Sequence, residues 1–133
     1  MSCLSPELNE SDINKISILG LAYIGDCVFE MLVRTMLISK GHTASLDLHH
    51  SAVELVNAPA QHEFYNRISG LLSSEETEIY RRGRNAKVNS VPHNASVADY
   101  HSATGLEALF GWLYLKGQKS RVEELFSAGM NEL

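Results

Sequence analysis

The 133-residue sequence is poor in cysteine and has no long apolar run. Its two cysteines, Cys3 and Cys27, are too few and too scattered for a disulfide framework or a zinc site. A membrane span needs about 18–20 apolar residues, and a glycine and three charged residues interrupt the best candidate between positions 25 and 34. The polar, acidic start lacks the basic residues and apolar core of a signal peptide. We therefore expect a cytoplasmic protein that does not enter membranes.

Motifs of common catalytic and metal sites are also missing. The six histidines form no HExxH or comparable ligand spacing. There is no glycine-rich phosphate loop and no Ser/His/Asp or Cys/His motif. Sustained apolar/polar alternation between hairpin turns is absent too, so the sequence gives no indication of a β-sheet. These absences favour an all-α fold.

Basic residues are scarce overall but concentrated in one place. The chain has 11 Lys and Arg against 16 Asp and Glu, a net charge of −5, which at first argues against a nucleic-acid partner. Yet Arg81, Arg82, Arg84 and Lys87 fall within seven positions, and no acidic residue occurs between positions 79 and 98. One interpretation is a solvated helix end, where basic side chains are favoured. The other, which includes Asn85, is a surface that contacts phosphates.

The chain length and the absence of repeats predict one domain, residues 1–133. Helix caps, glycine stops and apolar spacing predict about six helices. Their approximate ranges are 16–39, 45–57 with Ser45 or Asp47 as cap, 59–69, a fourth opened by a Ser73/Glu76 capping box, 96–116 and 119–130. Residues 87–95, which include Asn89, Pro92 and Asn94, are expected to form a loop.

The first predicted helix is apolar on every side, with residues such as Phe29 and Met36 outside its main stripe. A helix that is apolar all round is buried all round. A bundle of about six short helices hardly encloses one completely, so a second subunit could supply the cover through a two-fold interface. The alternative is a central core helix in a monomer, and the pattern does not decide between them.

Two carboxylates stand alone in apolar helices. Asp26 follows Gly25 within LAYIGDCVFEMLVR, and Glu107 lies within ATGLEALFGWLYL. Burial of an ionised carboxylate costs free energy unless a partner offsets the charge. Asp26 could instead cap a second helix after Gly25, and Glu107 could lie on a solvated face. Otherwise the two helices share a divalent cation, with Gly105 and Gly111 permitting close approach.

Taken together, LAYIGDCVFE, RRGRNAK and SATGLEALFGWLYL resemble the ribonuclease III family. The closest resemblance is to its Mini-ribonuclease III group, which has the nuclease domain without a double-stranded RNA-binding domain. The three stretches look like the signature helix, the basic segment of the Mini group and the second catalytic helix. DLHHSAVELVNAPAQ falls where the family has a similar helix. The resemblance covers roughly residues 14–128.

The resemblance implies roles for individual residues. Asp26 matches the signature aspartate and Glu107 the second-helix glutamate, so both would be catalytic and would bind Mg²⁺, or Mn²⁺ in its place. Full-length members have further carboxylates where this chain has Ala22 and Thr104, which leaves the number of metal ions per site open. The residues implied to bind RNA are Arg81, Arg82, Arg84, Asn85 and Lys87.

The implied activity is a Mg²⁺-dependent endoribonuclease that cleaves double-stranded RNA and leaves 5′-phosphate and 3′-hydroxyl ends. It would act as a homodimer packed through the signature helices, on a stem of precursor 23S ribosomal RNA, with a ribosomal protein as a further candidate partner. Two other classes stay open. One is a catalytically silent dimer that holds structured RNA, and the other is a helical Mg²⁺-dependent hydrolase of nucleotides.

Overall fold

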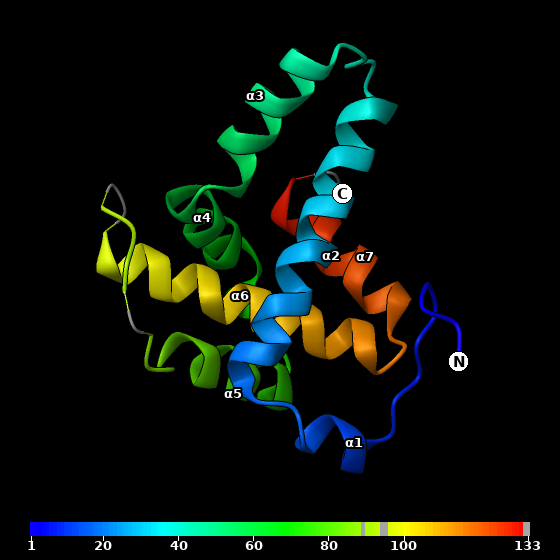
Figure 1. The fold of residues 1–133 in the computed structure, drawn as a ribbon, viewed down its shortest axis with the longest axis vertical. Coiled ribbons are helices and arrows are strands. Elements are labelled where there is room, and N and C mark those ends of the chain that lie inside the picture. The colour runs from blue at the N-terminus through cyan, green and yellow to red at the C-terminus, as the bar shows by residue number, and fades with distance from the viewer. Residues whose placement is uncertain (89, 94–95, 132–133) are drawn as a thin grey trace.

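The computed structural model describes residues 1–88, 90–93 and 96–131, and this part of the chain contains helices and no strand, as predicted. The elements are α1 (Glu10–Asn14), α2 (Ile18–Ser39), α3 (Ser45–Val56), α4 (Ala58–Ile68), the 3₁₀ turn η1 (Ser69–Leu71), α5 (Ser74–Arg84), α6 (Val97–Leu115) and α7 (Lys119–Gly129) (Figure 1). The described residues between α5 and α6 form no helix, in agreement with the predicted loop. Asn89, Asn94 and Ala95 of that loop lie outside the described residues.

Most helix starts follow the predicted caps. In the Ser73/Glu76 capping box, the Glu76 amide donates to Ser73 Oγ (3.1 Å) and the Ser73 amide donates to Glu76 Oε1 (2.8 Å). The Ser96 hydroxyl likewise accepts from the Asp99 amide (3.0 Å). The caps thus place the starts of α5 and α6 where the sequence predicts them.

The start of α3 differs from the prediction. Ala44 occupies the N-cap position without a side-chain hydrogen bond, where we expected Ser45 or Asp47. Asp47 lies inside the helix and its Oδ2 is 2.7 Å from His42 Nδ1. The short helix α1, capped by the Asn9 side chain, is not predicted at all. Its single turn is too short for an apolar repeat to mark it.

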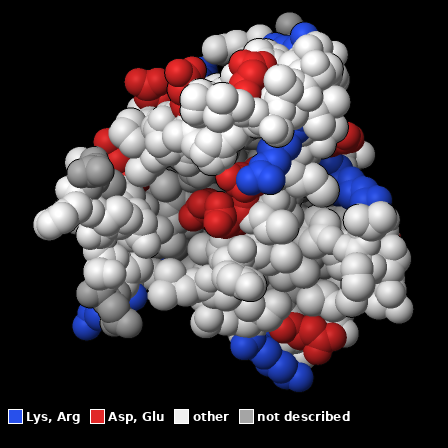
Figure 2. Space-filling view, turned by 45° about the horizontal axis from the view of Figure 1, so that its top comes forward, with Lys and Arg blue, Asp and Glu red and all other residues white. Residues whose placement is uncertain are grey.

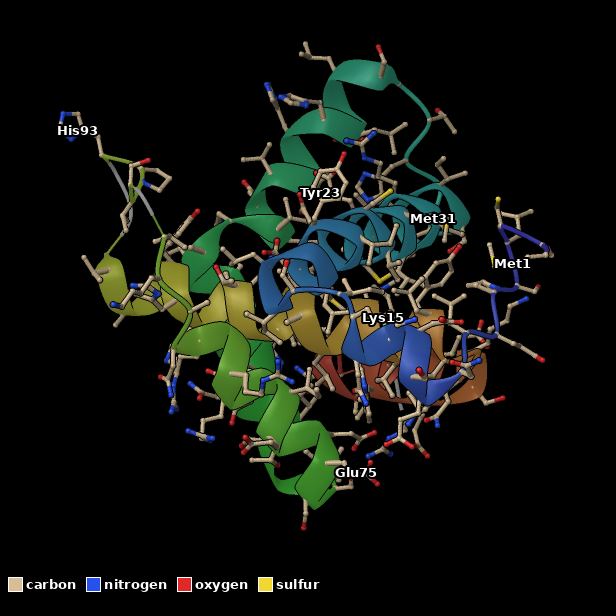
Figure 3. The ribbon with its side chains drawn as sticks, turned by 60° about the horizontal axis from the view of Figure 1, so that its bottom comes forward. Met1, Lys15, Tyr23, Met31, Glu75 and His93 are labelled. Carbon is tan, nitrogen blue, oxygen red and sulfur yellow. The ribbon has the colours of Figure 1, made fainter. Side chains whose placement is uncertain are left out.

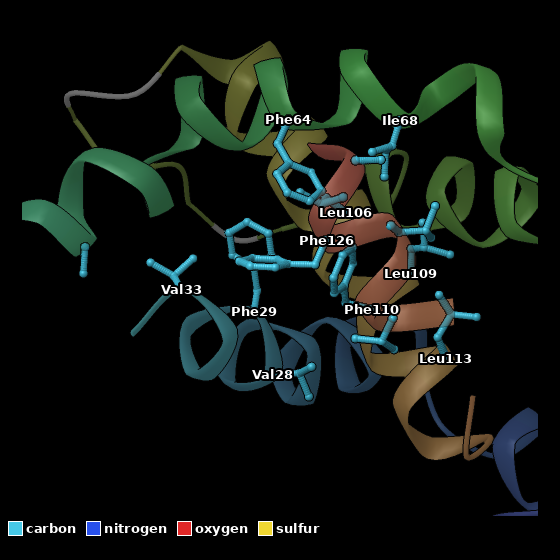
Figure 4. Packing of buried hydrophobic residues seen from close by; sticks show 14 of the residues in the cluster. Val28, Phe29, Val33, Phe64, Ile68, Leu106, Leu109, Phe110, Leu113 and Phe126 are labelled. Atoms are coloured by element: carbon cyan, nitrogen blue, oxygen red, sulfur yellow. The ribbon is translucent and has the colours of Figure 1, made fainter. Parts of the chain in front are cut away.

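The core of the fold surrounds α6, which packs against α2, α4, α5 and α7 and crosses the middle of Figure 1. Phe29 of α2 lies at its centre. The Phe29 ring centroid is 5.1 Å from that of Phe64, 5.5 Å from Phe110 and 5.9 Å from Phe126, all nearly edge to face (Figure 4). Three further helices therefore pack on one residue of α2.

One side of α2 is uncovered, so the prediction that this helix is buried on every side is wrong for the single chain. Tyr23 is 84% exposed and Met31 is 49% exposed, and both project outward from the helix (Figure 3). Phe29, by contrast, is 1% exposed, and Met36 is partly buried. Because one apolar side of α2 is uncovered, α2 is not the enclosed central helix of a monomer, which was the alternative interpretation of its sequence. No described helix is both long and apolar enough to cross a membrane.

Candidate active site

Helices α2 and α6 cross with their backbones in contact. A Cβ placed on Gly25 would lie 1.6 Å from the Glu107 carbonyl oxygen, and one placed on Gly111 would lie 2.0 Å from the Leu21 carbonyl oxygen. No side chain can be accommodated at either position, which explains why α2 carries a glycine that costs about 1 kcal/mol of helix stability. The crossing places Glu107 beside Asp26, the residue that follows Gly25.

Asp26 lies on the exposed side of α2, so the expectation that it is buried in the single chain is wrong. The alternative in which it caps a second helix is also wrong, because α2 is continuous from Ile18 to Ser39. Glu107 is mostly buried on α6. The face drawn in Figure 2 carries a group of acidic side chains near its middle, with a basic side chain beside them. On α2, Glu30 is held by Arg34 through a 2.8 Å ion pair one turn beyond Asp26.

Glu107 occupies an environment that disfavours its negative charge. Burial, the nearby charge of Asp26 and a hydrogen bond between the two carboxyl groups raise the pKa of Glu107 to about 8. The Gln61 side chain opposes this change by hydrogen bonding to the Glu107 carboxyl, and the Glu30 charge reinforces it weakly. At neutral pH the two carboxyl groups therefore hold one proton unless another cation replaces it.

A divalent cation fits this pair of oxygen ligands, because Mg²⁺ commonly uses one or two carboxylates and completes its coordination with water and substrate. Within the described residues, no group of three or more His, Cys, Asp or Glu side chains is placed to hold a metal. Ala22 and Thr104, the positions at which the resemblance implied that further carboxylates are missing, are each 6% exposed. Thr104 Oγ1 donates to the Tyr100 carbonyl oxygen (3.1 Å).

Glu107 also lines a hollow of about 350 Å³ between the end of α3, the start of α4 and α6. Tyr100 and Thr104 of α6, Pro92 of the loop, and Gln61 of α4 contribute to its wall. The hollow gives Glu107 an open side on which a substrate can lie. The sequence does not single out Gln61, because a glutamine near a helix start belongs to no recognisable motif.

The sequence pattern of the Ribonuclease III domain matches residues 19–118. The chain is 40% identical to a Mini-ribonuclease 3 of Clostridium tetani, covering 96% of this chain and 85% of that protein. It is 41% identical to a Mini-ribonuclease 3 of Enterococcus faecalis over 87% of this chain and 89% of that one. The chain belongs to the ribonuclease III family. It is accordingly assigned as an endoribonuclease.

The fold agrees with this membership in the ribonuclease III family. A crystal structure of a protein from Fusobacterium nucleatum superimposes with a TM-score of 0.80 at 30% sequence identity. The match covers 92% of this chain and 98% of that one. The predicted all-α, ribonuclease III-like fold is confirmed.

The basic segment predicted to bind RNA lies at the end of α5 and just beyond it. Arg81 is already paired, since its Nε and Nη2 donate to Glu78 at 3.0 and 2.6 Å. Arg84 Nε donates to Asn85 Oδ1 at 3.3 Å. Arg82 and Lys87 are exposed. The basic side chains of this segment are therefore not equally available to a ligand, because Arg81 would have to leave or share the Glu78 carboxylate.

A polar network that the sequence does not reveal ties the basic segment to α6. Tyr80 is 3% exposed, and its hydroxyl is 2.9 Å from Ser102 Oγ, which is itself 2.8 Å from His62 Nδ1. The Tyr80 ring stacks on Tyr65 with centroids 3.6 Å apart, and the Arg84 guanidinium lies 5.7 Å from the Tyr80 centroid. These contacts join α4, α5 and α6 and fix the direction in which the basic segment leaves the fold.

A second glycine contact sets the position of α5 along α6. A Cβ on Gly83 would lie 2.9 Å from Gly105 Cα, and one on Gly105 would lie 2.6 Å from the Tyr80 carbonyl oxygen. Gly105 and Gly111 are six residues apart on α6, or about 9 Å along its axis. The same helix thus holds the carboxylate pair at one crossing and the basic segment at the next.

Proposed function

We propose that this protein is a Mg²⁺-dependent endoribonuclease of double-stranded RNA, with Asp26 and Glu107 as its catalytic and metal-binding residues. One observation carries the proposal: the Gly25–Gly111 crossing brings two carboxyl groups together where neither has a cationic partner strong enough to keep Glu107 ionised at neutral pH. A divalent cation, Mg²⁺ or Mn²⁺, supplies that charge. The products would carry 5′-phosphate and 3′-hydroxyl ends.

The chain itself would supply two oxygen ligands and a shaped surface. Asp26 offers a carboxylate from the exposed side of α2, and Glu107 offers one from the wall of the hollow beside α4. When bound, the cation lowers the pKa of a coordinated water and stabilises charge on the phosphodiester. Because Glu107 holds a proton in the metal-free state, loading the site releases that proton.

We propose that the RNA backbone lies along the basic segment, with Arg82, Arg84, Asn85 and Lys87 as direct contacts. Arg81 joins them only by sharing Glu78. A-form RNA presents phosphates and 2′-hydroxyls to proteins and is recognised largely by shape, which suits a segment without exposed aromatic rings. The two crossings lie roughly 9 Å apart along the axis of α6, so one helix carries both Glu107 and the contact with α5.

We propose that two chains pair through the uncovered side of α2, so that each cuts one strand. Leu19, Tyr23, Met31 and Ile38 are between 39% and 84% exposed on this helix. Together with Leu4, they form an apolar strip that water would otherwise cover. Pairing there would bury the strip, and the charged pair beside it, Glu30 and Arg34, already satisfies itself through a 2.8 Å ion pair.

The natural substrate we propose is a stem of precursor 23S ribosomal RNA, processed in the cytoplasm by a single domain spanning residues 1–133. The Mini-ribonuclease 3 proteins that align over most of this chain support a role shared with that group. A ribosomal protein bound to the same RNA is a candidate partner. Primer extension on ribosomal RNA from cells lacking the protein would test whether an unprocessed end accumulates.

The decisive experiment separates the three functional classes. The purified protein is incubated with a duplex RNA and, separately, with nucleoside triphosphates, each with Mg²⁺ and with EDTA. Duplex cleavage only with Mg²⁺ supports the proposal. Binding without cleavage would identify a silent RNA-binding dimer, and triphosphate hydrolysis would identify a nucleotide hydrolase.

A further inference from the structure

Gln61, at the start of α4, is buried beside Glu107 but is not fully hydrogen bonded. The residue is 2% exposed. Its Nε2 donates to the Val56 carbonyl oxygen at the end of α3 (3.1 Å), and its side chain hydrogen bonds to the Glu107 carboxyl. Among the described residues, Gln61 Oε1 has no hydrogen-bond partner. A buried oxygen without a donor costs about 1–3 kcal/mol, and such a group calls for an explanation.

The amide orientation follows from its neighbours. A glutamine amide has two N–H donors on nitrogen and lone pairs on oxygen. When Glu107 is ionised, as it must be to bind a cation, the Val56 carbonyl and the Glu107 carboxylate are both acceptors, so both require the nitrogen side of Gln61. A flipped amide would set its oxygen against two other oxygens. The free oxygen is therefore a consequence of the two contacts that Gln61 makes.

The free oxygen borders a space that can hold a donor. Gln61 and Glu107 line the same hollow of about 350 Å³, together with Asn57, Tyr100 and Thr104. The Thr104 hydroxyl, on the α6 side of the hollow, is already committed to the Tyr100 carbonyl. Among the described residues no group donates to this oxygen, and an ionised Glu107 has no proton to give. A hydroxyl that enters the hollow would bring the missing donor next to Glu107.

We propose that Gln61 is a positioning residue for the reaction: its nitrogen fixes the Glu107 carboxyl, and its oxygen accepts a hydrogen bond from a hydroxyl that enters with the substrate. This inference rests on the proposed function. Two sources have the required chemistry, a water bound to the cation and a ribose 2′-hydroxyl of the RNA strand. Side chains that orient a metal ligand typically change metal affinity or activity 10–100-fold when replaced.

The test compares Gln61→Met, which keeps the side-chain volume without hydrogen bonding, with Gln118→Met. Gln118 is an exposed residue that makes no side-chain cap at the start of α7, so it controls for the chemical change. Three quantities are measured: thermal unfolding in EDTA, Mn²⁺ affinity by electron paramagnetic resonance without RNA, and single-turnover cleavage. Cleavage is measured on a duplex and on the same duplex with one 2′-deoxynucleotide at the mapped cut.

Two results would support the proposal and name the donor. If the donor is a metal-bound water, Gln61→Met weakens Mn²⁺ affinity 10–100-fold without RNA, and the deoxy substitution slows parent and variant alike. If the donor is the 2′-hydroxyl, Mn²⁺ affinity holds and Gln61→Met slows cleavage 10–100-fold. The deoxy substitution then slows the parent but not the variant. In both cases the unfolding temperature stays near that of the parent, because the variant loses two hydrogen bonds but also removes the unpaired buried oxygen.

Other results would overturn it. Parent-like metal affinity and cleavage would do so, as would a loss of activity that only follows a loss of folded protein. A slower variant with unchanged metal affinity and an undiminished deoxy effect would also exclude the hydroxyl. Should Gln61→Met fail to fold, Gln61→Glu keeps the shape and the acceptor oxygen but removes the donor, and parent-like cleavage by it would refute the role. Failure of the parent itself to cut the duplex would instead count against the proposed function.

Discussion

Replacing Glu107 by glutamine should stabilise the metal-free protein by an amount that grows with pH. The Glu107 pKa is raised from an ordinary 4.5 to about 8, chiefly by burial. The folded protein therefore holds this proton more tightly than the unfolded chain. The sign follows: stability falls as pH rises from 4.5 toward 8, by about 1.36 kcal/mol per pH unit. At pH 7 the loss sums to about 3 kcal/mol.

Glu107→Gln removes this penalty, because the new amide is neutral at every pH and can donate to Asp26. For a chain of this length, about 3 kcal/mol corresponds to a rise in Tm of roughly 10 °C at pH 7 in EDTA. At pH 5 the two proteins should unfold at nearly the same temperature. Circular dichroism melts at pH 5, 6, 7 and 8 give the four differences directly.

Divalent cations should offset most of this difference. A cation that binds only the ionised pair stabilises the parent by about 2.7 kcal/mol at a concentration of 100 Kd, whereas Glu107→Gln should gain little. The variant should also be inactive in duplex cleavage. A Tm difference that does not change with pH would refute the raised pKa of Glu107. A variant that Mg²⁺ stabilises as much as the parent would refute the binding of the cation by Glu107.

Four further predictions address other parts of the molecule. Asp26→Asn should abolish Mg²⁺-dependent cleavage without changing the circular dichroism spectrum, and full cleavage would contradict its role. Arg82→Ala should weaken duplex binding in EDTA and lower the slope of log affinity against log salt concentration by about one, the loss of one phosphate contact, measured by fluorescence anisotropy. Met31→Arg should give a folded monomer by light scattering, and an intact dimer would place the interface elsewhere. Glu76→Gln should lower the free energy of unfolding by about 2–3 kcal/mol at pH 7 and progressively less below pH 4, by urea titration.

The last of these predictions depends on a buried ion pair. Glu76 is 5% exposed and receives hydrogen bonds from Arg121 Nε (2.8 Å) and Nη2 (2.7 Å). The Arg121 bonds hold the pKa of Glu76 below its ordinary value. Stability from this carboxylate is therefore present above its ordinary pKa and disappears as the pH falls through the lower folded-state pKa.

The sequence predicts the helices well because their determinants are local. The Ser73/Glu76 box and the Ser96 cap act within one turn, and Gly117, with φ of +80°, ends α6 within two residues of the predicted position. Patterns of this kind require no knowledge of which helices touch. Where the local pattern is absent, as at Ala44, the predicted cap is wrong.

Exposure is predicted poorly because it depends on which helices meet. The apolar sequence around Asp26 suggested a buried charge, but the backbone contact at Gly25 turns one side of α2 toward α6 and leaves Asp26 on the other edge. Phe29, which we considered for a subunit interface, is in the core for the same reason. A charged residue there would unfold the chain rather than dissociate a dimer.

Gln61 shows the limit of sequence reasoning most clearly. It is 46 residues from Glu107 in the chain, and its burial results from three separate elements, the end of α3, the start of α4 and the middle of α6. Local patterns can mark Glu107 because a charge in an apolar helix is anomalous. A glutamine is not anomalous near a helix start, so only the packing reveals that its amide faces a carboxylate.

The charge distribution explains why an acidic protein can act on RNA. The net charge is −5, and Asp26, Glu30 and Glu107 lie together where a phosphate would have to approach. At about 4 Å, two like charges repel by about 1 kcal/mol in water and by several times more near a protein surface. In the function we propose, a cation held by Asp26 and Glu107 would reverse this sign at the reacting phosphate alone, while Arg82, Arg84 and Lys87 would attract the backbone from the neighbouring crossing on α6. Attraction would thus be confined to the cation and the basic segment, and the acidic remainder of the protein would repel RNA that lies anywhere else.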